Sequence, residues 1–258
     1  IPELDPKKTN RAAAHRDLFL TLAALTSPQQ KPKQNWENAI LAMQGFTKTG
    51  KIALDKGNGV NFGVPAQKTG IQLMQHLIDQ HGLEGALEWV RSPKTGREIA
   101  EMRRDSGLFH PKNDKLQSYL ASETNLTATY PGIAMMGPKV GEFMQNATGF
   151  DQSAVTVDLW LTKTYNRLVG RLQDVSAQEA ENKEPKSAPR GLSERALIKA
   201  LVTDVAEKAG IDPSAMQAAL WYFEQRLYRN HGINSDSQNF SGASEAAAEK
   251  RGISINTG

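Results

Sequence analysis

Two residues between Tyr130 and Leu168 have the types and positions that nucleophilic chemistry needs. Lys139 follows Gly137-Pro138, and a glycine followed by proline is a favoured helix start. Backbone N–H groups in a first turn point outward and can hold a phosphate. The positive end of the helix dipole disfavours a charged ammonium there, so Lys139 is a candidate nucleophile. Asp158, in the run VTVDLW, is predicted to be an N-cap or first-turn carboxylate of the next helix.

The elements that must position these residues are predicted to be almost all helices. Apolar residues recur at helical spacing along most of the chain, and glycine and proline separate the runs. Weak strand content is expected around residues 60–64. The helices are expected over residues 10–25, 34–45, 71–90 with a break near Gly82, 97–104, 115–122, 138–146, 157–172, 193–209 and 215–230. The predicted fold class is therefore all-α, a helical bundle in two lobes with a cleft between them.

Composition sets limits on the function. The 258 residues are 39% hydrophobic and 23% charged, which is enough to build a core. The net charge of +3 permits nucleic-acid binding without requiring it. The absence of cysteine excludes disulfides, thiol nucleophiles and iron–sulfur clusters. The five histidines lack metal-ligand spacing, so neither a metal nor a cofactor is expected, and no apolar run is long enough for a membrane span.

Composition also divides the chain. Residues 1–172 are predicted to form the helical core, with a hairpin at residues 130–146. The polar, proline-containing stretch 173–191 indicates a linker or loop. Residues 192–232 are predicted to be helices that pack on the core, and residues 233–258, rich in Ser, Asn, Gly and Ala, a flexible tail.

The segment from Tyr130 to Leu168 resembles the helix-hairpin-helix DNA glycosylases. Their hairpin motif ends in a glycine-led turn with a catalytic lysine, which Gly137 and Lys139 match. Their catalytic aspartate follows in a V-D motif, which Asp158 matches nineteen residues after the lysine. The match is close over about forty residues. It departs from the family pattern at Met135, which stands where the first hairpin glycine belongs.

The resemblance implies a function and a mechanism. The chain would bind double-stranded DNA through hairpin residues Gly137 and Gly141, and it would flip a nucleotide into a pocket. Lys139 would attack the sugar C1′ and form a Schiff base, with help from Asp158, which implies a glycosylase with AP-lyase activity.

The resemblance also implies further DNA contacts. Arg167 lies on the helix after the aspartate, as in the family. Upstream, Gln29 or Gln30 would wedge into the DNA stack. The protein would act as a monomer without cofactors.

Other interpretations stay open. Taken alone, Lys139 is a solvated lysine and Asp158 a helix cap. The same scaffold could serve as a non-catalytic DNA-binding module, or as a toxin or effector domain that attacks host DNA by the same chemistry. The run ALWYFEQRLY, residues 219–228, resembles segments of large phage or mobile-element polyproteins. The resemblance implies a cytoplasmic location in a bacterial or phage-infected cell.

Overall fold

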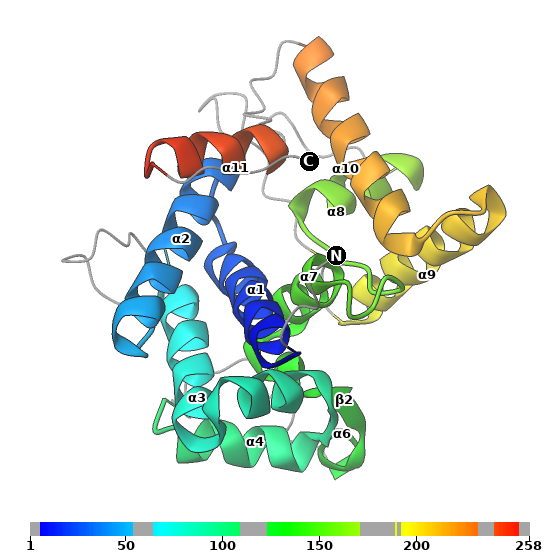
Figure 1. The fold of residues 1–258 in the computed structure, drawn as a ribbon. Coiled ribbons are helices and arrows are strands. Elements are labelled where there is room, and N and C mark those ends of the chain that lie inside the picture. The colour runs from blue at the N-terminus through cyan, green and yellow to red at the C-terminus, as the bar shows by residue number, and fades with distance from the viewer. Residues whose placement is uncertain are drawn as a thin grey trace. The chain divides into compact units, whose positions relative to one another are not determined.

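The computed structural model of the chain is predominantly helical, which confirms the all-α class (Figure 1). It describes residues 6–53, 64–108, 123–170, 189, 192–231 and 240–252. The helix expected over residues 115–122, all but Val64 of the strand expected at 60–64 and nearly all of the linker expected at 173–191 lie outside these residues. The chain forms two compact units, of which the first is Ile1–Phe150 with Gln238–Gly258 and the second is Asp151–Ser237.

The first unit contains most of the helices and a two-stranded sheet. Its elements are α1 (Pro6–Thr26), α2 (Pro32–Thr49), α3 (Pro65–Arg91), β1 (Pro93–Thr95), α4 (Gly96–Asp105), α6 (Glu123–Thr127), β2 (Thr129–Pro131), the 3₁₀ helix η2 (Gly132–Met136), α7 (Pro138–Thr148) and α11 (Phe240–Glu249). Helix α1 packs against α2, α3 and α7. Its side chains Leu18, Leu22 and Leu25 are almost fully buried, so α1 is the centre of this core.

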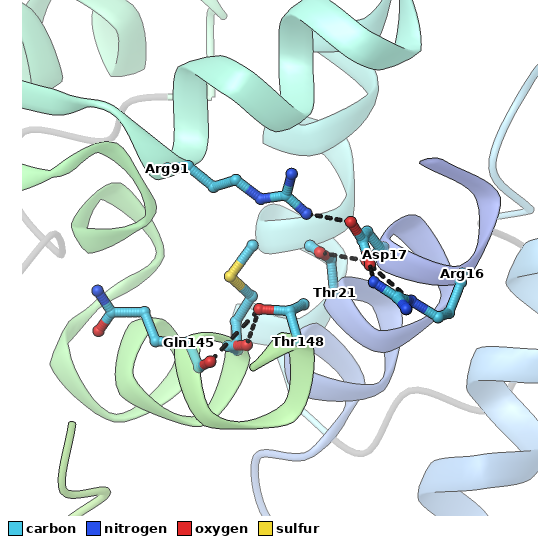
Figure 2. A network of polar contacts seen from close by, with 7 residues as sticks. Arg16, Asp17, Thr21, Arg91, Gln145 and Thr148 are labelled. Carbon is cyan, nitrogen blue, oxygen red and sulfur yellow. Dashed lines mark hydrogen bonds and ion pairs between the residues drawn. The ribbon is translucent and has the colours of Figure 1, made fainter. Parts of the chain in front are cut away.

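A buried ion pair links α1 to α3 (Figure 2). Arg91, at the end of α3, donates a hydrogen bond to the carboxylate of Asp17 in α1. Arg16 also donates to this carboxylate, over 2.9 Å from Nε and 2.8 Å from Nη2. Because Asp17 is only 6% exposed, its charge needs these partners, and removal of either would leave it poorly compensated.

The sheet is followed directly by η2, in the segment predicted to be the hairpin. Strands β1 and β2 are antiparallel, with Pro93 opposite Pro131. The N–H of Gly132 then donates to the carbonyl of Ser92 over 3.0 Å. A side chain at Gly132 would overlap the carbonyl oxygen of Trp89, so only glycine lets η2 approach the end of α3 this closely.

The second unit is formed by three helices among its described residues. They are α8 (Leu159–Leu168), α9 (Leu192–Ala209) and α10 (Pro213–Asn230). Val155, Val157, Leu161, Tyr165, Ile198 and Val202 form its core. Because α8 packs on α9 and α10, the boundary between units falls after Phe150, whereas composition predicted that residues 151–172 belong to the N-terminal core.

The C-terminal tail expected to be flexible contains a docked helix. Helix α11 packs on α2 (Figure 1), with Ala243, Ala247 and Ala248 buried. Lys250 donates to both carboxylate oxygens of Glu37 in α2, each over 3.1 Å. Residues 240–249 of the predicted tail thus form a helix that packs on α2, because small alanines at helical spacing let two helices approach closely, which composition alone does not reveal.

No helix in the described ranges has the length and apolar character that a membrane crossing requires.

We predict that Gly132→Ala destabilises the first unit strongly. The new methyl group would press on the Trp89 backbone, and overpacking costs about 1–3 kcal/mol. The matched control is Gly50→Ala, where a Cβ meets no atom within 4 Å and only the positive φ of 71° is unfavourable, a cost of about 1 kcal/mol. Urea unfolding of both variants measures the difference. Equal losses of unfolding free energy in the two variants would contradict the close approach of η2 to α3.

Candidate functional site

Lys139 lies in the first turn of α7, as the sequence predicted. Gly137 joins η2 to α7 with a φ of 92°, and Pro138 is the first helical residue. The positive φ at Gly137 requires glycine and turns the chain sharply before Lys139. The Lys139 side chain is half-buried, and it has no hydrogen bond or ion pair with any residue that the structure describes. Its amine is therefore available for a ligand.

The backbone donors at this turn differ from those that the sequence suggested. The N–H of Gly137 already donates to Ala134 over 2.9 Å, and the N–H of Gly141 to Gly137 over 3.0 Å. Pro138 has no N–H, and no side chain caps the helix. The N–H groups of Lys139 and Val140 therefore remain for an anion. The rule that N2 and N3 of a helix lack intrahelical partners would have identified them.

Helices η2 and α7, in the segment predicted to be the hairpin, pack against the core of the first unit. Met135, which occupies the expected glycine position, is fully buried, and Arg103 of α4 donates to its carbonyl. A Cβ at Gly141 would lie 3.4 Å from Ile133, so α7 packs directly on η2. Met135 is therefore part of the hydrophobic core of the first unit.

The turn between α1 and α2 presents the predicted wedge residues. Gln29 is exposed and has a φ of 56°, the only positive φ of a non-glycine residue in the described chain. Gln30 is half-buried, and its N–H donates to Ser27 over 3.2 Å. Because a positive φ is uncommon for glutamine, the turn needs support from the surrounding structure.

A buried glutamine supplies this support. Gln67, in the first turn of α3, is fully buried, and its Nε2 donates to the carbonyls of Thr26 and Pro28, each over 2.7 Å. Thr26 also donates to the side chain of Asn35 at the start of α2. These bonds hold the turn from both sides, and they direct Gln29, rather than Gln30, into solvent.

Gly70 of α3 lies beside both α1 and η2. A Cβ at Gly70 of α3 would lie 2.9 Å from Leu25 Cδ2 and 3.8 Å from Met136 Sδ. Leu25 precedes the Gln29 turn by four residues, and Met136 precedes Lys139 by three. The structure thus packs the end of α1 and the end of η2 on the same residue of α3.

Asp158 belongs to the second unit, where it caps α8 as predicted. Its Oδ1 accepts the N–H of Leu161 over 2.9 Å, and its Oδ2 accepts the indole N–H of Trp221 over 2.9 Å. Burial lowers the pKa of the nearby Arg195 guanidinium, and the Asp158 charge partly offsets this effect. Since Lys139 lies in the first unit, the convergence of Lys139 and Asp158 stays a prediction.

Arg167, the last predicted DNA contact, lies on α8 and pairs with a buried carboxylate. Its Nη2 is 2.8 Å from Glu224 of α10, whose side chain is 1% exposed. The Arg167 side chain as a whole is 38% exposed. Its first role in this structure is to neutralise Glu224.

Within the described ranges, no three side chains of His, Asp or Glu lie close enough together to hold a metal ion. Comparison with protein-family models, with curated proteins and with solved structures found no match to this chain.

We predict that Gln67→Leu loosens the Gln29 turn. The change leaves two carbonyl groups without their buried donor, which costs about 1–3 kcal/mol. Hydrogen exchange of the Gln30 amide should accelerate with the loss of stability. Gln72→Leu is the control, because this residue of α3 is half-buried and makes no contact with the turn that the structure shows. Equal exchange in the two variants would show that Gln67 does not brace the turn.

Proposed function

We propose that the protein is a DNA glycosylase with AP-lyase activity that uses Lys139 as its nucleophile. The observation that carries the proposal is the unpartnered Lys139 amine beside two unused N–H donors at the start of α7. The exposed Gln29, on a turn braced by Gln67, supports it, because a flipped nucleotide leaves a gap in the stack that a side chain can fill.

Each group has a defined task in this proposal. The N–H groups of Lys139 and Val140 bind a backbone phosphate, which fixes the register of the DNA without reading its sequence. Gln29 enters the stack in place of the extruded base. Phosphate at the α7 terminus and glutamine in the stack together hold the sugar near the Lys139 amine.

The chemical step is a displacement at the sugar. The neutral amine forms a bond to C1′ while the bond between C1′ and the base nitrogen breaks, and the base leaves with the electron pair and takes up a proton. The attacking nitrogen loses a proton and the sugar ring opens, which gives an imine. Loss of a C2′ proton then expels the 3′ phosphate and cuts the strand.

Asp158 would stabilise the positive charge that develops on the sugar. This role requires the carboxylate to act while it accepts hydrogen bonds from Leu161 and Trp221. These two bonds also favour the second candidate function, a non-catalytic DNA-binding module in which Asp158 is only a helix cap.

We predict that borohydride traps a covalent adduct between the protein and DNA that carries an abasic site. Lys139→Gln should abolish the adduct, because an amide cannot form an imine. Lys48→Gln, at an exposed lysine near the end of α2, should leave the yield unchanged. If no adduct depends on Lys139 across a panel of abasic and damaged duplexes, the glycosylase is excluded. DNA affinity that is then equal in wild type and Lys139→Gln would support the binding module.

The variant Asp158→Asn separates the two roles of the carboxylate. Asparagine caps a helix about as well as aspartate, so the second unit should keep its fold, although the bond from Trp221 is lost. If Asp158 stabilises the sugar, the rate of adduct formation should fall at least about tenfold, the size of a lost electrostatic contact. An unchanged rate, with circular dichroism showing an intact fold, would restrict Asp158 to its structural role.

A further inference from the structure

The outer face of α10 has an unusual composition for a surface exposed to water. The exposed residues of this helix recur every three or four positions, so they share one face. They are Ala215, Ala218, Ala219, Tyr222, Phe223, Arg226, Arg229 and Asn230. The face begins with small apolar residues and ends with aromatic and basic ones, and it contains no acidic residue. We refer to Tyr222, Phe223, Arg226 and Arg229 as the α10 face.

The rings on this face are large and accessible. Tyr222 is 40% exposed and Phe223 is 45% exposed. The guanidinium carbons of Arg167 and Arg226 each lie 5.7 Å from the centre of the Phe223 ring. This distance is within the range of cation–π attraction. Arg167 also neutralises the buried Glu224, so the unpaired charge beside the ring is that of Arg226.

The acidic side chain of α10 is buried, whereas the basic side chains of its outer face are exposed. The only acidic residue of α10, Glu224, is 1% exposed, and it is neutralised by Arg167 on the inner side of the helix. The α10 face is consequently positive. A negatively charged partner with flat apolar groups would complement both its charge and its rings.

We propose that the α10 face binds single-stranded DNA. Arginine guanidinium groups pair with backbone phosphates, and exposed aromatic rings stack on bases. The bases must be unpaired, because a duplex covers the faces of its bases by stacking. The choice of DNA over RNA rests on the proposed function, in which the first unit disrupts a duplex. The choice of unpaired bases rests only on the exposed rings.

Fluorescence anisotropy of a labelled single strand of about 15 nucleotides, within the usual site sizes, tests the proposal. All variants are made in the Lys139→Gln background, which removes the proposed nucleophile. The affinities therefore test the α10 face alone, and borohydride trapping tests the glycosylase separately. Phe223→Ala should raise the Kd for the single strand about tenfold, in the range of one lost base stack. Phe223→Tyr should restore the affinity, because the stacking ring returns.

Two control variants separate specific binding from general effects. Leu197→Ala removes a 55% exposed apolar side chain from α9 and should leave the affinity unchanged. Arg226→Ala should weaken binding and reduce the salt dependence by about one phosphate contact, whereas Lys208→Ala, at an exposed lysine of α9, should do neither. Thermal unfolding of each variant shows that the second unit remains folded.

Several results would overturn the proposal. One is a Phe223→Ala variant with unchanged affinity, and another is an equal loss in Leu197→Ala. Tighter binding to the matching duplex would exclude recognition of unpaired bases, and tighter binding to RNA of the same sequence would exclude the choice of DNA. Binding to vesicles containing phosphatidylserine but not to the oligonucleotide would assign the face to a membrane surface. Self-association abolished by Phe223→Ala, without DNA binding, would assign it to a second copy.

Discussion

The close approach of the hairpin backbone to α3 is the constraint on which the candidate site depends. A Cβ at Gly132 would lie 2.2 Å from the carbonyl oxygen of Trp89, and a Cβ at Gly70 would meet the side chains of Leu25 and Met136. Leu25 near the end of α1 and Met136 at the end of η2 therefore pack on the same residue of α3. The buried pair of Asp17 and Arg91 acts on the same helices, since it links α1 to the end of α3 (Figure 2).

The second unit is organised by buried polar contacts between α8 and α10. Asp158 accepts the indole N–H of Trp221, and Arg167 pairs with the buried Glu224. Lys163, only 2% exposed, lies 4.1 Å from the Trp160 ring centre and 4.8 Å from that of Tyr228. These contacts fix which side of α10 faces inward. Tyr222 and Phe223 are therefore left on the outside, so the same interactions that stabilise the unit also create the proposed DNA-binding face.

Two kinds of chemistry thus lie in separate units of one chain. The first unit supplies a lysine amine, two unused N–H donors and a rigid glutamine turn. The second supplies a carboxylate that is already a helix cap, together with a basic aromatic face.

The sequence alone determined the local features of this protein. The start of α7 after Gly137-Pro138, the cap at Asp158 and the all-helical class follow from backbone and side-chain preferences within a few residues. Tertiary structure decided the rest. Gln67 braces a turn about forty positions earlier, Trp221 binds Asp158 from a distant helix, and residues near the C-terminus dock on α2. Such contacts join residues that leave no periodic signal in sequence, and they form only when folding brings the helices together.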